Sequence, residues 1–210
     1  MNTTIKTLSI AAALAASLGL AGCAANAGSG NSMPIDHGSA SPMSSTMPGA
    51  GMSPAADANH NQADIMFAQM MIPHHAQAVE MSGIILDKQD IPAEVTALAT
   101  KIKAAQAPEI EQMTGWLQGW NVPTAMSDHT GHGMTGMVDD AGIDKLKSAT
   151  GAEAARLFLQ QMIGHHEGAI DMAQQEISAG KSPEAVKLGH DIVDAQQAEI
   201  TQMKQLLASL

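Results

Sequence analysis

Two adjacent histidines occur twice in the chain, each time in the same chemical setting. The segment that begins at Met70 reads MMIPHHAQAVEM, and the segment that begins at Gln161 reads QMIGHHEGAIDM. In each, a methionine lies three residues before the first histidine, and a carboxylate and a second methionine follow the pair. Imidazole is a borderline ligand and the methionine thioether a soft one. Together they suit Cu(I), Ag(I), or copper that cycles between Cu(I) and Cu(II).

The candidate metal ligands fall into a stronger and a weaker group. The stronger group is the two histidine pairs with their flanking methionines: His74, His75, Met71, Met81, His165, His166, Met162 and Met172. Methionine at helical spacing is more often core packing than ligand, and we interpret Met66 and Met70 in that way. The weaker candidates are two further helical methionines and four residues between the repeats: Met113, Met203, His129, His132, Met134 and Met137.

Other metals fit these residues less well. Structural zinc sites normally use thiolates, and the chain has one cysteine, Cys23. Di-iron helical bundles use a Glu-x-x-His motif, whereas both copies here read Met-x-x-His, from Met71 and from Met162. A soft neutral donor therefore replaces a hard anionic one, which favours copper and silver over iron.

A helical wheel places the first histidine of each pair inside the protein. At about 100° per residue, Phe67, Met71, Ala78 and Met81 lie within roughly 60° of His74, on one apolar stripe. The second copy repeats the pattern around His165. His75 and His166 then lie at the edge of their stripes, and the acidic side chains of Glu80 and Asp171 point to solvent.

A histidine in a core needs a hydrogen-bond partner or a metal ion. On the partner helices, Gln106 and Gln196 occupy matching positions and are candidates to hold an imidazole in one tautomer. Their alternative role is to fix the register of the bundle. Pro73 and Gly164 precede the two pairs, so each pair lies either at a kink or at the start of a helix.

The chain positions these residues through an internal duplication. Residues 64–120 match residues 155–210, with the histidine pairs 91 positions apart (165 − 74). Each copy reads as two helices joined by a turn, with Pro92 and Ser182-Pro183 suited to start the second helix. One hairpin leaves an apolar face that a second can cover. The predicted fold is all-α, a four-helix bundle of two tandem helical hairpins.

The remaining segments suggest export. Residues 1–22 read as a lipoprotein signal peptide, with Lys6 before an apolar run and Leu20-Ala21-Gly22 before Cys23, the predicted lipidation site. Residues 23–61, rich in Met, Gly, Ser and Pro, read as a disordered, flexible tether, and residues 62–210 as the bundle. Residues 121–142 form a His- and Met-rich loop between the repeats. We expect a protein lipid-anchored in the bacterial cell envelope, in the periplasm or on the outer surface.

Composition narrows the classes of partner. The formal charge of −11 argues against nucleic acid and against an anionic membrane surface, since both reward lysine and arginine. With two Phe, two Trp and no Tyr, the core must consist of aliphatic residues and methionine, which favours helices. A cation is the natural ligand of such a chain.

The doubled His-His motif resembles the domain-of-unknown-function family 305. In one copy the motif is followed by Glu109-Ile110-x-x-Met113, and in the other by Glu199-Ile200-x-x-Met203. The resemblance covers about residues 60–210. It implies a ferritin-like four-helix bundle and, because some members are exported copper-binding proteins linked to copper tolerance, copper handling. It also implies that the four histidines and nearby methionines are the ligands.

Three functional hypotheses remain open. The first is an envelope protein that binds copper, with Cu(I) favoured, Cu(II) and silver as alternatives, and a copper-handling protein as partner. It would sequester or deliver the metal without catalysing a reaction. The second is a ferritin-like oxidase that converts Cu(I) to Cu(II). The third is a structural or partner-binding bundle in which the methionine stripes are packing.

Overall fold

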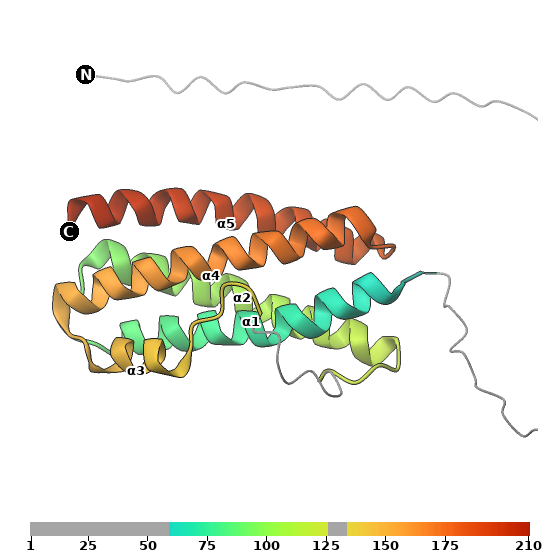
Figure 1. Ribbon diagram of the computed structural model, residues 1–210, viewed down its shortest axis with the longest axis horizontal. Helices are drawn as coiled ribbons and strands as arrows, with labels where there is room; N and C mark the ends of the chain where they lie inside the picture. Colours follow the sequence, from blue (N-terminus) through green and yellow to red (C-terminus); the bar gives the residue numbers. More distant parts are fainter. Residues whose placement is uncertain (1–58, 126–133) are drawn as a thin grey trace, which may run out of the picture. The chain divides into compact units, whose positions relative to one another are not determined.

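The computed structural model describes residues 59–125 and 134–210. These residues form five helices and no strand: α1 (Gln62–Leu86), α2 (Ala93–Gly119), α3 (Asp140–Ser148), α4 (Gly151–Ala179) and α5 (Pro183–Ser209). The four long helices lie alongside one another as a bundle, and short α3 packs against α1 and α4 (Figure 1). The predicted all-α, four-helix fold class is confirmed. The predictions for residues 1–58, including Cys23, lie outside the described residues.

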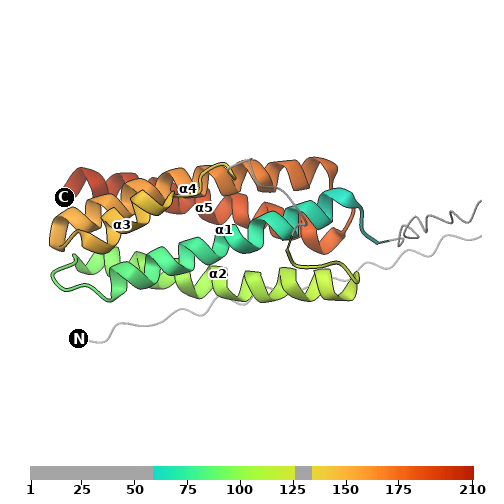
Figure 2. The same ribbon diagram turned by 60° about the horizontal axis from the view of Figure 1, so that its bottom comes forward.

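The bundle consists of two helical hairpins. α1 packs mainly on α2, and α4 mainly on α5, while the contact of α1 with α4 joins the two hairpins (Figure 2). α1 and α4 run antiparallel, because Phe67 near the start of α1 packs in one cluster with Ala173 near the end of α4. The two copies of the sequence repeat therefore meet at the middle of α1 and α4, where the histidine pairs lie.

The helix boundaries follow from local sequence. Asn61 caps α1 in a capping box with Asp64, and the Ser182 side chain accepts a hydrogen bond from the Ala185 N–H at the start of α5. α2 begins directly after Pro92, as predicted. α1 continues through Pro73, and α4 continues past Gly164 without a break. The alternative in which each histidine pair starts a helix is therefore wrong.

The connection between the hairpins contains a helix that the sequence analysis does not predict. α3 begins at Asp140, inside the expected loop 121–142, with the Asp139 side chain accepting a hydrogen bond from the Gly142 N–H. It buries Ile143 and Leu146 against the bundle. At nine residues it is too short to show a clear period among the glycines and acidic residues around it.

The apolar core has two parts, one toward each end of the bundle. One part includes Phe67 and Leu117, and the other includes Phe158 and Leu146. Along α1 and α4, the histidines lie between the residues of the two parts. Within the described ranges, no helix is both long and apolar enough to cross a membrane.

Candidate metal centre

Four imidazoles meet at the middle of the bundle. The side chains of His74, His75 and His166 are 0% exposed and that of His165 is 1% exposed. The ring centroids of His74, from α1, and His165, from α4, lie 3.7 Å apart with the ring planes tilted by 38°. The rings of His165 and His166 are 6.4 Å apart. The antiparallel crossing of α1 and α4 thus brings both histidine pairs into one buried group.

Carboxylates from the partner helices hold the second histidine of each pair. Nε2 of His75 lies 2.7 Å from Oε2 of Glu109 on α2, and Nε2 of His166 lies 2.9 Å from Oε2 of Glu199 on α5. A carboxylate only accepts, so Nε2 carries the proton and donates. Nδ1 of each ring is then left with a free lone pair, the state in which an imidazole binds metal.

His74 is held by the backbone. Its Nε2 lies 3.3 Å from the carbonyl oxygen of Thr135, which can only accept, so Nε2–H donates and Nδ1 again keeps its lone pair. Both ring nitrogens of His165 lack a hydrogen-bond partner in the described part of the chain.

Five buried ring nitrogens are consequently without a protein partner: Nδ1 of His74, His75 and His166, and both nitrogens of His165. Leaving one buried polar atom unpaired costs on the order of 1–3 kcal/mol. Five such atoms at one place are difficult to explain as packing. Metal ions bound at the lone pairs would satisfy one nitrogen of each ring, four of the five, because one nitrogen of neutral His165 carries a proton. The residues therefore fit a soft cation.

The imidazoles of His74, His165 and His166 are neutral at physiological pH. Burial lowers the pKa of His74 to about 4, and the neighbouring His75 adds to this effect. Burial and the proximity of His74 and His166 lower the pKa of His165 to about 2. Burial also lowers the pKa of His166, although its hydrogen bond to Glu199 opposes the shift. Neutral imidazole is the form that ligates metals.

Glu199 remains ionised beside this group. Burial alone would raise its pKa, but the hydrogen bond and charge of His166, with Lys101 3.3 Å from Oε1, lower it overall. Glu109 is more open, at 24% exposed, and Lys101 itself is 61% exposed. The two carboxylates are therefore anchors for the rings at the edge of the site.

Six methionines flank the histidines in two equivalent groups. Toward one end of the bundle the core contains Met71, Met113 and Met172, and toward the other end it contains Met162, Met203 and Met81. These are the same three positions of the repeat, taken once from each copy. All six are 5% exposed or less. The weaker candidates Met113 and Met203 thus share their clusters with the stronger ones.

A short segment, residues 134–138, covers the histidines from outside, and we refer to it as the strap. Besides the Thr135 carbonyl on His74, the strap forms two hydrogen bonds of 2.8 Å between the backbone of Val138 and the side chain of Gln77. A Cβ atom at Gly168 would lie 2.1 Å from the Thr135 oxygen, so only glycine permits this approach. Met134 and Met137 belong to the strap and are partly buried. His129 and His132 lie outside the described residues.

Two expectations about the histidines' surroundings need correction. His75 and His166 are fully buried and not marginal, because α2 and α5 cover the edge of the stripe. Their partners are Glu109 and Glu199, whereas the side-chain oxygens of Gln106 and Gln196 are buried without a partner. These glutamates recur in the sequence, 34 residues after His75 and 33 after His166, but the sequence alone assigns them no role.

The prediction for the acidic residues of the motif is confirmed, since Glu80 is 51% exposed beside Lys147 and Asp171 is exposed.

Within residues 59–125 and 134–210, no group of three or more His, Cys, Asp or Glu side chains is arranged to hold a metal ion. A site of two imidazoles, with or without thioethers, is compatible with that finding.

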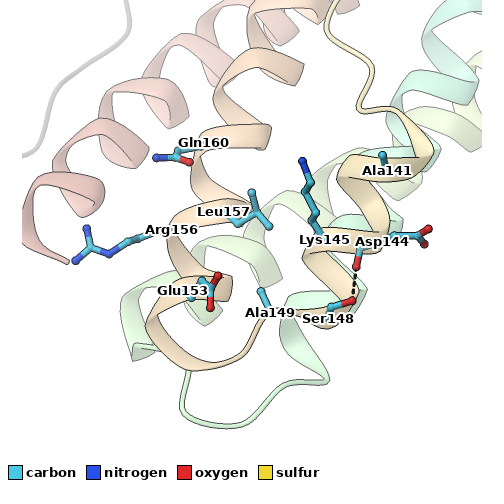
Figure 3. A pocket seen from close by; sticks show the side chains of 9 residues that line it. All are labelled: Ala141, Asp144, Lys145, Ser148, Ala149, Glu153, Arg156, Leu157 and Gln160. Carbon is cyan, nitrogen blue, oxygen red and sulfur yellow. Dashed lines mark hydrogen bonds between the residues drawn. The ribbon is translucent and has the colours of Figure 1, made fainter.

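A hollow of about 760 Å³ lies away from the histidines, between α3 and α4. Figure 3 shows its mixed walls, with Lys145 and Asp144 from α3 and Glu153, Arg156 and Leu157 from α4. No histidine or methionine lines it. The four central histidines carry five unpartnered ring nitrogens in one place, which makes that centre the candidate site.

Fold and site together define a four-helix bundle of two hairpins with a buried histidine group between them. The chain belongs to the family described as Domain of unknown function (DUF305), whose model matches residues 64–207. The resemblance seen in the sequence is therefore confirmed. No curated protein matches the chain.

Solved structures of the family share the fold. A DUF305 protein of Streptomyces coelicolor that is thought to be secreted is 39% identical, with a TM-score of 0.67, over 70% of this chain and 93% of that one. A DUF305 fragment from Deinococcus radiodurans is 31% identical, with a TM-score of 0.66, over 72% and 99%. CopM in its Cu(II)-bound form is 38% identical, with a TM-score of 0.60, over 70% and 96%. CopM has also been solved with Cu(I) and with silver bound.

Proposed function

We propose that this protein binds Cu(I), with Ag(I) as an alternative ion, inside the bundle at one or more sites of two imidazoles each, drawn from His74, His75, His165 and His166. The observation that carries the proposal is the set of five buried ring nitrogens without a protein partner. Support comes from CopM, which is 35% identical and has been solved with Cu(I) and with silver.

The chemistry of the centre favours a soft monovalent ion. The imidazoles of His74, His165 and His166 are neutral, and the methionines on both sides are neutral soft donors. Candidate thioether ligands are Met71, Met81, Met162 and Met172, with Met113 and Met203 in the same clusters. The carboxylates of Glu109 and Glu199 do not reach the unpartnered Nδ1 atoms, since they bind Nε2 of His75 and of His166. Cu(II), which prefers harder ligands, would bind less tightly here.

The role that follows is metal sequestration or delivery outside the cytoplasm, without turnover, in support of copper tolerance. Export and anchoring through Cys23 rest on the signal sequence of residues 1–22, and the relative from Streptomyces that is thought to be secreted supports export. His129, His132, Met134 and Met137 would serve as weaker capture sites between the repeats. A copper-handling protein would then be the natural partner for delivery.

A Cu(I) titration against a competing chelator tests the proposal. The informative variant is His74→Leu/His165→Leu, because neither histidine pairs with a carboxylate and leucine suits an apolar core. We expect retained helicity in circular dichroism and Cu(I) affinity at least ~100-fold weaker, typical of losing principal ligands. The control, His129→Ala/His132→Ala, should lose far less of the tight binding, because these residues belong only to the weaker capture sites. Equal affinity in wild type and in the His74/His165 variant would refute the proposal.

A further inference from the structure

A small pocket at the surface, near the start of α1, is lined by three methionines. Met66 and Met70 lie one helical turn apart on α1, and Met172 faces them from α4 across a space of about 140 Å³. Within the described residues, Met66 is the only large hydrophobic side chain that is exposed, at 44%. An exposed thioether at the mouth of a pocket has no packing role that explains it.

The equivalent surface of the second repeat has no methionine at the positions of Met66 and Met70, and its Leu157 lines the hollow between α3 and α4. Leu157 and Gln161 stand where Met66 and Met70 stand in the first repeat (157 − 66 = 91). There α3 packs on the surface, with the Gln161 side chain donating a 2.9 Å hydrogen bond to the Gly142 carbonyl. Leu157 packs against the apolar core. Packing thus accounts for the residues of the second repeat, but not for the exposed Met66.

The methionines also form a graded path from solvent to the histidines. Met66 is exposed, Met70 is partly buried, and Met172 is 5% exposed. Met172 shares its core cluster with Met71, which is fully buried one turn from His74. Soft donors are therefore present at each depth between the surface and the histidine group.

We propose that this pocket binds one Cu(I) or Ag(I) ion through the thioether sulfurs of Met66, Met70 and Met172, as a second site that shares only Met172 with the candidate ligands of the histidine centre. Its other walls favour a soft ion, because Ala63, Phe67 and Ala179 offer no donor. Glu176 lines the inner wall, but burial and the neighbouring Asp64 raise its pKa to about 8, so its carboxyl group is protonated and uncharged there. Gln175 is the remaining polar side chain of the lining.

The position of the pocket suits it to a loading role, passing metal ions from solvent to the histidine centre. An ion held at Met66 and Met70 would pass by exchange of thioethers to Met172 and Met71, and from there to His74. This second step rests on the proposed function of the histidine centre. Binding at the pocket does not, so the two can be tested separately.

The test uses Ag(I) as the probe and protein labelled with ¹³C at the methionine methyl groups, followed by NMR. In the His74→Leu/His165→Leu background the histidine centre is disabled. We expect the methyl signals of Met66, Met70 and Met172 to shift there on addition of Ag(I), as they do in wild type. Adding Met66→Leu/Met70→Leu should abolish the response of Met172, while Met134→Leu/Met137→Leu, which removes as many thioethers, should not.

Two results would overturn the proposed site. In the first, the methyl signals of Met66 and Met70 do not shift when Ag(I) is added. In the second, the methyl signal of Met172 still shifts in the Met66→Leu/Met70→Leu variant. Failure of the histidine centre would look different, since wild type and the histidine variant would then take up the same amount of Ag(I). The loading role predicts slower filling of the histidine centre in Met66→Leu/Met70→Leu at unchanged final affinity. An unchanged filling rate would remove that role.

Discussion

Gln77 and Gly168 occupy equivalent positions in the two repeats (168 − 77 = 91), and both hold the strap over the histidines, in opposite ways. Gln77 holds it by two side-chain hydrogen bonds to the backbone of Val138. Gly168 holds it by having no side chain, so that the Thr135 carbonyl reaches the surface of α4. A single strap crosses both repeats, so the two equivalent positions contact different parts of it. This explains why one position is glutamine and the other is glycine.

We expect Gly168→Ala to lift the strap from the centre. The new Cβ would lie 2.1 Å from the Thr135 oxygen and 2.8 Å from Cα of Gly136, both backbone atoms that cannot rotate away. Losing the strap's three hydrogen bonds, at about 1 kcal/mol each, would speed release of Cu(I) to a chelator by roughly 100-fold. Hydrogen exchange of residues 134–138 should rise at the same time.

Gly164→Ala is the matched control, one turn away on the same helix. A Cβ at Gly164 meets no atom within 4 Å, so the variant should keep the strap and gain up to about 1 kcal/mol of stability from better helix propensity. Similar release rates in the two variants would show that the strap does not retain the metal.

Replacing the carboxylates should weaken binding without removing a ligand. Glu109→Gln and Glu199→Gln keep the size of the side chain but not the charge that orients the Nε2–H of His75 and His166. Partners of this kind typically contribute about 10–100-fold to metal affinity. The same Cu(I) competition titration measures the loss. Glu80→Gln, at an exposed position, should leave the affinity unchanged, and an equal loss there would point to net charge alone.

The sequence predicts those parts of the centre that depend on helical period. His74 and His165 share a stripe with Phe67, Met71, Phe158 and Met162, and any packing that buries this stripe buries both histidines. His75 lies off the stripe, and its burial depends on how far α2 wraps around α1. The helical period of α1 alone does not predict how α2 packs on it, so it does not predict that His75 is buried.

The strap and the glutamate anchors could not be predicted for related reasons. Residues 134–138 have no period, and their place is fixed by contacts with Gln77 and Gly168, 57 residues before Met134 and 34 after it (134 − 77 and 168 − 134). Glu109 reads as a solvent-facing residue, because a charged side chain is seldom buried without a partner. Only the assembled helices show that His75 is that partner.

The low pKa values of the histidines predict that copper is retained in mild acid. A ligand histidine with an ordinary pKa near 6.5 begins to bind protons in place of metal as the pH falls below that value. His74 and His165, with pKa values of about 4 and about 2, remain neutral at pH 5. We therefore expect the Cu(I) affinity, corrected for the chelator, to be nearly the same at pH 7 and pH 5. A tenfold loss over that range would show that the rings titrate normally.

The same shifts govern the stability of the metal-free protein. Folded-state values below 6.5 mean that the unfolded chain binds more protons between about pH 4 and 6.5. The free energy of unfolding should therefore fall as the pH is lowered from 6.5 toward 4. His74→Leu/His165→Leu should weaken this dependence in urea denaturation at a series of pH values. A dependence as steep as that of the wild type would assign it to other groups.

A pair of buried acids gives stability the opposite dependence at higher pH. Asp64 is ionised: burial raises its pKa, but hydrogen bonds from Glu176 and from the N–H groups of Ser182, Asn61 and Lys181 lower it overall. Burial and the neighbouring Asp64 raise the pKa of Glu176 to about 8. Glu176 therefore stays protonated and joins the end of α4 to the start of α1.

Because the unfolded chain loses the Glu176 proton near pH 4.5, the folded state binds more protons from there up to about pH 8. The free energy of unfolding should then decrease as the pH rises, by on the order of 1 kcal/mol per unit at most. The range from 6.5 to 8 isolates the effect, since the histidines contribute below 6.5. Glu176→Gln, which keeps a donor toward Asp64, should flatten the curve there, whereas Asp171→Asn at an exposed site should not. Parallel curves for wild type and Glu176→Gln would mean that Glu176 is already ionised in the folded protein.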